Sequence, residues 1–435
     1  MGNKKNIFIF GIDDYNLEEL NSIEQAEQYN FISLFRAEEI MILLQGDLID
    51  YEKIIGQAKK QLNQHQGTID AIIGFYDPAM LPVFYLCEEY GLNGPGLFSP
   101  LLCEHKYWSR LEQKKIVPAN IPEFTCLDPF SNHQLKDITI STPFWLKPVK
   151  SYGSQLGYKI ENQQDLDKSL EEIRQNIKYF AHPFNHMLSL ADTSVLPEET
   201  RKIDGNYCIV ESIIQGNLFT IEGFVYKGQV HQHGFFDSVT YDESSSFFAY
   251  LTPGQLDDKI KERMMAITEK VMKQNKFNNT VFNIEFFYDE KDDQIWLLEV
   301  NTRISQSHSE IFKLVHGSSN HQFLVQLATG KMPSMQKYQG KYKIAGKLHH
   351  RVFFKKGKVT AVPSDKDLEQ LEEEFDAKIY LDVKKGQELS ELPGQDSFSS
   401  QLVRIHMGAQ SKEELYSKYD ELVDKLNISV ESHEE

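Results

Sequence analysis

The chain has few cysteines, and their spacing does not suit a metal site or a disulfide framework. Its 435 residues include four cysteines, none of them in a CxxC pair: Cys87, Cys103, Cys126 and Cys208. This spacing argues against a zinc knuckle and against a small disulfide-stabilised domain, because both need closely spaced or paired cysteines. The expected location is the cytoplasm, where thiols stay reduced.

Long apolar runs are also missing. No segment approaches the roughly 20 consecutive apolar residues that a helix needs to cross a bilayer. The apolar run at residues 7–10 follows a basic start, but it ends at Gly11 and Asp13 and is too short for the core of a signal peptide. We therefore expect no membrane partner.

Positive charge is scarce relative to negative charge. The chain has 46 Lys and Arg against 64 Asp and Glu, which gives a net charge of -18. Affinity for nucleic acids depends mainly on basic side chains that neutralise phosphates, so we expect no nucleic-acid partner. The hydrophobic content of 40% is typical of a globular protein. The length predicts about two to four domains.

The central feature of the sequence is a predicted β-hairpin. Residues 281–287 and 294–303 are rich in β-branched and aromatic residues. The polar segment at residues 288–293 has the composition of a hairpin loop. We therefore expect two antiparallel strands here.

Side-chain alternation along this hairpin gathers polar groups on one face. Successive side chains of a strand point to opposite faces, so Glu285 faces away from the large apolar residues on either side of it. The same alternation predicts Leu297, Glu299 and Asn301 on one face of the second strand. Arg303 follows just beyond.

Two carboxylates and an amide oxygen are a suitable set of ligands for a hard divalent cation. Mg²⁺ takes few protein oxygens and completes its octahedron with water and phosphate. A neighbouring guanidinium would face the negative charge that accompanies such an ion. The alternative is an ordinary solvated hairpin with its acids in water.

Two upstream segments have the composition of a phosphate-binding site. Residues 143–148 form a short apolar strand that ends in Lys147-Pro148, and a small-residue loop at 151–157 follows. Such a loop can direct backbone N–H groups at phosphate oxygens, although a GxxxG segment is more often only a turn.

A predicted helix at residues 103–115 adds further positive charge. Lys106, Arg110 and Lys114 are spaced by four residues and share one face of it. A solvated charged face is the alternative explanation.

Together these segments resemble a known superfamily. Glu285 followed by Glu299-Val300-Asn301-Thr302-Arg303-Ile304 resembles the metal-binding signature of the ATP-grasp enzymes. These include biotin carboxylase, D-alanine:D-alanine ligase and the bacterial L-amino-acid ligases, which are the most similar group. The resemblance implies that Glu285, Glu299 and Asn301 hold two Mg²⁺ ions, or Mn²⁺ in their place, against the phosphates of ATP. It also implies that Arg303 stabilises the reaction intermediate.

The resemblance assigns roles to the upstream segments as well. Lys147 and the glycine loop match the phosphate-binding segment of the family, and Lys106 matches a helix lysine that contacts phosphate. The loop residues implied are Ser151, Gly153 and Ser154. Relatives often have more glycines in this loop.

The hinge region supplies the remaining implied residues. Residues 207–216 resemble the segment that lines the adenine slot, through Glu211 and the backbone around Ile213. Leu218 occupies the position where an acid often holds the ribose hydroxyls. Glu222 matches an acid that faces the amino-acid pocket of L-amino-acid ligases, and an ordinary exposed strand glutamate is the alternative. His308 is either a substrate contact or a structural histidine.

The rest of the chain is expected to complete a mixed α/β and α+β architecture. We expect strands at residues 6–11 and 70–75, a helix at 78–90, a loop or insertion at 182–204, a helix at 257–277 and a polar loop at 305–309. The last 95 residues favour strands at 348–355, 379–384 and 401–407, with a final helix from Ser411 that has a capping box completed by Glu414.

The resemblance implies an ATP-grasp fold in five segments. These are an N-terminal open α/β domain (1–99), a linking helical segment (100–142), a small lobe with the glycine loop (143–215), a large lobe with the metal site (216–335) and a C-terminal α+β lobe (336–435).

The implied function is an ADP-forming carboxylate-amine ligase that acts through an acyl phosphate. The expected cofactors are ATP and Mg²⁺, and the expected partners are a small-molecule carboxylate and an amine, most simply amino acids. A homodimer is left open. Two alternatives stand: an ATP-binding module without catalysis, and a carboxylating enzyme similar to biotin carboxylase.

Overall fold

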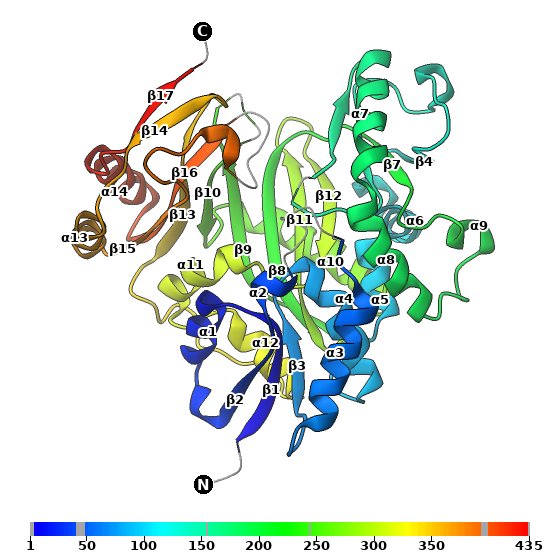
Figure 1. Ribbon diagram of the computed structural model, residues 1–435, viewed down its shortest axis with the longest axis horizontal. Coiled ribbons are helices and arrows are strands. Elements are labelled where there is room, and N and C mark those ends of the chain that lie inside the picture. The colour runs from blue at the N-terminus through cyan, green and yellow to red at the C-terminus, as the bar shows by residue number, and fades with distance from the viewer. Residues whose placement is uncertain are drawn as a thin grey trace.

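The computed structural model describes residues 4–40, 48–153, 155–242, 244, 246–392 and 399–433. These residues form four β-sheets with helices packed on them. The N-terminal sheet and the small lobe lie beside one large central sheet, and the C-terminal part extends that sheet (Figure 1). Among the described residues, no helix is long and apolar enough to span a membrane.

The N-terminal part is an open parallel α/β unit, as expected. Its strands are β1 (Lys5–Ile12), β2 (Tyr29–Arg36) and β3 (Ala71–Gly74), in the order β2-β1-β3. Its helices are α1 (Asp14–Asn21), α2 (Ala37–Ile40), α3 (Tyr51–Gln64) and α4 (Asp77–Glu89). Both faces of β1 are buried: Phe8 and Phe10 pack in one core and Ile7 and Ile9 in another. This double burial explains the continuous apolar run in the sequence.

The helix expected at residues 103–115 is two helices, α5 (Phe98–Glu104) and α6 (Lys106–Ile116). His105 interrupts them with an extended backbone conformation, and its Nδ1 accepts a hydrogen bond from the backbone N–H of Trp108. The prediction of one continuous helix was wrong because His105 is the N-cap of the second helix.

The small lobe is a four-stranded sheet covered by helices. Its strands are β4 (Phe124–Leu127), β5 (Phe144–Pro148), β6 (Tyr158–Ile160) and β7 (Cys208–Ser212), in the order β4-β7-β5-β6. Its helices are α7 (Gln163–Asn176), α8 (Lys178–Leu190) and α9 (Glu198–Arg201).

Residues 182–204 were predicted to be a loop or insertion, and the prediction of a loop was wrong because α8 and α9 occupy much of this segment. Pro183 lies inside α8. A proline in the interior of a helix normally lowers the stability of that helix by about 3 kcal/mol. Phe180, Phe184 and Met187 are buried at helical spacing, and the latter two pack in a core of the N-terminal part. This burial outweighs the local cost of the proline.

The central sheet has eight strands in the order β12-β11-β8-β9-β10-β13-β16-β15, and all neighbours are antiparallel. The strands are β8 (Asn217–Tyr226), β9 (Gln229–Thr240), β10 (Phe247–Thr252), β11 (Thr280–Asp289), β12 (Gln294–Asn301), β13 (Ile344–Val352), β15 (Ala377–Leu381) and β16 (Ser400–Ala409). The helices α10 (Asp258–Gln274), α11 (Gln306–His316) and α12 (His321–Ala328) belong to the same part of the chain. The polar loop expected at residues 305–309 is instead the start of α11.

The C-terminal part extends the central sheet and adds a small second layer. A two-stranded sheet joins β14 (Gly357–Ala361) to β17 (Ser429–Ser432), beside α13 (Asp365–Phe375) and α14 (Lys412–Lys425). The three predicted strands and the final helix are present. Ser411 is the N-cap of α14, but the Glu414 side chain accepts from the Gln410 N–H, so the predicted capping box was wrong in its second half.

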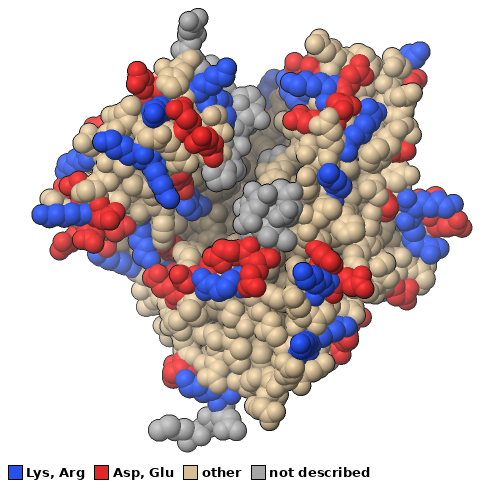
Figure 2. Space-filling model, viewed as in Figure 1, with Lys and Arg blue, Asp and Glu red and all other residues tan. Residues whose placement is uncertain are grey.

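Figure 2 shows the molecule hollowed between the C-terminal part and the small lobe. Charges of both signs lie around this hollow. The strands of the small lobe and the β11–β12 hairpin stand on one side of it (Figure 1).

Candidate active site

The β11–β12 hairpin brings the predicted metal ligands together. Glu285 pairs directly with Glu299, and Asn283 pairs with Asn301. The Asn301 side-chain amide donates to Glu285 Oε1 and to Asn283 Oδ1, each at 3.2 Å. Two carboxylates and two amide groups therefore meet on one face of the sheet.

A β-bulge makes this arrangement possible and corrects one predicted side-chain direction. The pairing shifts by one residue between Glu285 and Phe286, so that Phe286 pairs with Leu297. Leu297 therefore packs in the apolar core under the hairpin, whereas alternation had placed it with Glu299. The bulge lets β12 bury Leu297 and still direct Glu299 toward the site.

The electrostatics of the hairpin suit a divalent cation. Burial and the Glu299 carboxylate raise the pKa of Glu285 from 4.5 to about 8. A cation held between the two carboxylates would relieve this repulsion. Among the residues that the structure describes, no group of three or more His, Cys, Asp or Glu could hold a metal by itself. This donor set fits Mg²⁺, which draws its remaining ligands from water and phosphate.

Arg303 is held beside the hairpin by an acid from the N-terminal part. Its Nε donates to Asp77 Oδ2 at 2.8 Å. Burial disfavours both charges, yet their mutual attraction outweighs it, so the pKa of Asp77 is lowered and the pKa of Arg303 is raised. Asp77 was not predicted as a site residue because it lies more than 200 residues from its partner in the sequence.

The predicted adenine residue Glu211 is part of a buried ion-pair network. Its two carboxylate oxygens contact Arg110 Nε at 2.6 Å and Lys147 Nζ at 2.7 Å. These cations overcome the effect of burial and lower the pKa of Glu211 to about 2. Arg110 also donates to the Leu298 carbonyl oxygen at 2.7 Å, which links α6 to β12. Ile213 follows β7 and is partly buried.

Lys106 connects the glycine loop to the hairpin. Its Nζ donates to the Ser151 carbonyl oxygen at 2.7 Å. Burial lowers the pKa of Lys106 to about 8, while the Glu299 charge opposes this shift. Lys106 and Arg110 are therefore not on a solvated face, although Lys114 on the same helix is exposed.

The glycine loop is only partly described. Gly153 has a φ of +62°, and a Cβ there would meet no atom within 4 Å, so the backbone conformation rather than space favours glycine. Ser154 lies outside the described residues. Lys150, which was not predicted, forms an ion pair with Glu104, and Glu104 also accepts a hydrogen bond from Thr302. This contact links the loop to the segment after β12.

Glu222 lies at the centre of a buried polar network. Its carboxylate is fully buried and contacts His308 Nδ1 at 2.7 Å, Asn320 Nδ2 at 2.9 Å and His233 Nε2 at 3.2 Å. Burial alone would raise the pKa of Glu222, but the two histidines lower it well below its usual range. The exposed-strand alternative is therefore wrong. The His308 ring stacks on Phe236 with centroids 4.0 Å apart.

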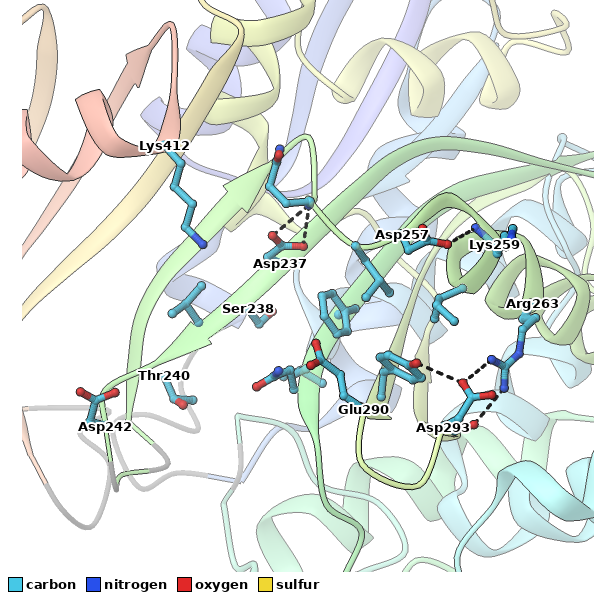
Figure 3. A pocket seen from close by; sticks show the side chains of 18 of the residues that line it. Asp237, Ser238, Thr240, Asp242, Asp257, Lys259, Arg263, Glu290, Asp293 and Lys412 are labelled. Carbon is cyan, nitrogen blue, oxygen red and sulfur yellow. Dashed lines mark hydrogen bonds and ion pairs between the residues drawn. The ribbon is translucent and has the colours of Figure 1, made fainter.

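A separate cavity of about 1350 Å³ lies elsewhere on the large lobe (Figure 3). It is lined by the ends of β8 and β9, the first turns of α10, the β11–β12 turn and Lys412. Arg263 bonds Asp293 at 2.6 Å on one wall, and Asp237 accepts from the Gln255 backbone on the other. Its described lining includes Leu218 but none of the residues predicted for ATP, metal or catalysis.

Comparison with known proteins identifies one domain of the chain and its fold. Residues 140–310 match the ATP-grasp domain family, and this segment includes Lys147, the glycine loop and the β11–β12 hairpin. The chain contains an ATP-grasp domain and has the ATP-grasp fold. No curated protein sequence matches the chain significantly.

Several solved structures share the fold over nearly the whole chain. L-amino acid ligase from Bacillus licheniformis matches with a TM-score of 0.70 and 16% identity, over 100% of both chains. Phosphoribosylglycinamide synthetase from Anaerococcus prevotii matches with a TM-score of 0.61 and 17% identity, over 98% of this chain and 99% of that chain. The biotin carboxylase domain of Hydrogenobacter thermophilus 2-oxoglutarate carboxylase, in complex with MgADP, ADP and bicarbonate, matches with a TM-score of 0.61 and 16% identity, over 99% and 92%. At these identities the similarity establishes the fold.

Proposed function

We propose that the protein is an ADP-forming carboxylate-amine ligase that joins amino-acid substrates through an acyl phosphate. The observation that carries this proposal is the cross-strand pair Glu285 and Glu299 with Asn301, which lies within reach of the charges of Lys106 and Arg303. A silent nucleotide-binding module has no need of all these groups in one place. Similarity in fold to an L-amino acid ligase supports amino acids as the substrates.

The cations of the site would bind the phosphates of ATP and stabilise the charge that develops during transfer. Lys147, on β5, and Lys106, whose Nζ donates to the Ser151 carbonyl oxygen, would contact phosphate oxygens. Glu285, Glu299 and Asn301 would hold Mg²⁺, which when bound neutralises phosphate charge during transfer. Arg303, oriented by Asp77, is placed to face the anionic oxygen that forms when the acyl group is attacked.

His308 is our candidate for the base that makes the amine nucleophilic. An ammonium group cannot attack an acyl phosphate until it loses a proton. With Nδ1–H donated to the Glu222 carboxylate, the neutral His308 ring carries its lone pair on Nε2, on the side away from Glu222. Nε2 would accept the ammonium proton as the C–N bond forms and phosphate leaves. Glu222 is then a positioning residue, because its oxygens are already bonded to protein groups.

The test is the release of phosphate from ATP with pairs of amino acids, together with mass spectrometry of the products. We expect Glu299→Gln to lower kcat/KM by at least about 100-fold, because it removes a metal ligand. Arg303→Ala should lower turnover much more than ATP affinity. Glu290→Gln, on the exposed hairpin turn, is the matched control and should retain activity.

Two outcomes would contradict the proposal. Tight ATP binding without turnover on a broad panel would favour a binding module. Bicarbonate-dependent phosphate release without an amide product would favour a carboxylating enzyme.

A further inference from the structure

A buried lysine without an acidic partner lies on the central sheet. Lys347 on β13 is 7% exposed, and its Nζ donates to Ser307 Oγ at 3.1 Å. No carboxylate of the described residues forms an ion pair with it. The Asp382 and Glu310 carboxylates attract the Lys347 charge without forming an ion pair with it. A buried charge without a direct partner is costly, so this lysine requires an explanation.

The nearest acids are already engaged by other cations. Asp382 bonds Arg404 at 2.8 Å, and Glu310 bonds Lys378 at 3.2 Å. Burial, together with the Arg404 charge, lowers the pKa of Lys347 to about 7. An anion beside Lys347 would restore its full charge.

The register of the sheet places Lys347 on the face that carries the predicted metal site. Directly paired residues of neighbouring strands share a face. Phe287 pairs with Leu218, Leu218 with Ser238, Ser238 with Tyr250, and Tyr250 with Lys347. Phe287 follows Glu285 by two residues and lies on the same face of β11. Lys347 is therefore at the far end of a row that starts beside the metal ligands.

Tyr250 connects the two ends of this row. The Glu285 charge adds to the effect of burial in raising the pKa of the Tyr250 hydroxyl, and the Arg303 charge opposes it. The Tyr250 ring lies 5.2 Å from the His308 ring and 6.0 Å from Lys347 Nζ. A substrate held at the catalytic groups could therefore extend past Tyr250 to Lys347.

Two further polar side chains, His349 and Ser307, lie at this end of the row. His349 lies two residues along β13 on the same face and is 5% exposed. Its Nδ1–H donates to Gln401 Oε1, because the Gln401 amide nitrogen already donates to Asp382, and the buried Nε2 therefore carries a lone pair that has no partner among the described residues. Ser307 adds a hydroxyl from the first turn of α11, where Ser305 provides no side-chain cap. The Ser307 oxygen accepts from Lys347 and leaves the O–H to donate, so the Lys347 ammonium and the Ser307 hydroxyl are both donors at this end of the row.

We propose that Lys347, Ser307 and Tyr250 form a subsite for a second anionic group of a substrate, a carboxylate or a phosphate that does not react. The inference rests on the proposed ligase function and deepens it, because it predicts that one substrate is acidic. An anion at the subsite pairs with the Lys347 ammonium and accepts from the neighbouring donors. The subsite selects by charge at a distance from the bond that forms.

The test compares matched acidic and neutral substrates under the same ligase assay. Glutamate against glutamine probes a carboxylate, and phosphoserine against serine probes a phosphate. We expect the acidic member of one pair to have a KM at least about tenfold lower, with kcat changed less than about threefold. The favoured pair identifies the kind of anion.

Variants of Lys347 separate charge recognition from folding. Lys347→Met should abolish the preference for the acidic member by raising its KM, whereas Lys347→Arg should retain part of it. Lys343→Met, at an exposed position four residues earlier, is the matched control. Methionine removes a buried unpaired charge, so the melting temperature of Lys347→Met should not fall.

Failure of this inference is distinguishable from failure of the proposed function. If neutral substrates are ligated as well as acidic ones and Lys347→Met changes neither KM, the subsite is refuted and the ligase stands. If Lys347→Met lowers kcat and the melting temperature equally for both members of each pair, the lysine is structural and the subsite is refuted. If no substrate is ligated at all, the proposed function itself fails.

Discussion

At the scale of single residues, Glu285 shows most directly how the fold prepares the site for a cation. Its carboxylate faces Glu299 across the hairpin, and Asn301 and Arg303 compensate only part of the repulsion. Burial and this repulsion favour the protonated form of the Glu285 carboxyl group, and an added positive charge would favour the carboxylate. Strongly shifted pKa values that arise from such like-charge pairs are typical of functional sites.

The pKa of Glu285 predicts a dependence of stability on pH in the metal-free protein. Its pKa of about 8 lies above the ordinary value of 4.5, so the folded state keeps a proton that the unfolded state loses. The free energy of unfolding should therefore fall as the pH rises from about 4.5 to about 8, with a slope of at most about 1.4 kcal/mol per pH unit. Urea unfolding across this pH range measures the effect.

A matched pair of variants isolates this contribution. Glu285→Gln should flatten the dependence in that window, whereas Glu290→Gln on the exposed turn should leave it unchanged. Mg²⁺ with ADP should also reduce the dependence, because the cation favours the carboxylate. An identical pH dependence in wild type and Glu285→Gln would refute the raised pKa.

At the scale of elements, helix α6 shows that equal charges on one face can have unequal roles. Arg110 is buried between Glu211 and the Leu298 carbonyl, whereas Lys114 one turn later is exposed. Their spacing of four residues places both side chains on the same face of the helix. Only the packing of β7 and β12 against α6 distinguishes them.

This difference predicts unequal costs for the same kind of substitution. Arg110→Met leaves Glu211 with a single cation and should lower the free energy of unfolding by about 3 kcal/mol. Lys114→Met should change it by less than about 0.5 kcal/mol. Chemical denaturation of the two variants measures both values, and equal losses would contradict the assigned role of Arg110.

The predictions that were wrong failed for the same physical reason. Alternation along β12 placed Leu297 beside Glu299, but a bulge, which depends on the partner strand, moved it into the core. Proline suggested a loop at residues 182–204, but burial of Phe184 against the N-terminal part stabilises α8. Local signals are overruled where a neighbouring element supplies more free energy.

At the scale of the whole molecule, one continuous sheet joins two of the proposed segments. The expected boundary between residues 335 and 336 separates β10 from β13, yet these strands are hydrogen-bonded neighbours. The core beyond β10 includes Ala249 and Leu251 together with residues of β13 and β16. Cutting the chain there would expose an edge strand and an apolar face.

A truncation after residue 335 tests this continuity. We expect the shortened chain to aggregate or to lose cooperative unfolding, because β10 would lose its antiparallel partner and part of its core. Size-exclusion chromatography and thermal unfolding measure the outcome. A soluble, cooperatively folded product would show that residues 336–435 are an independent addition.

The sequence by itself determined the local features: the hairpin, the alternation that groups Glu285 with Glu299 and Asn301, and the strand that ends in Lys147. These depend on neighbours within a few residues, where spacing translates directly into geometry. Only the tertiary structure decided that Asp77 orients Arg303 and that Glu104 connects Lys150 to Thr302. Such contacts join residues far apart in the chain, and their energy arises only when separate elements pack together and exclude water.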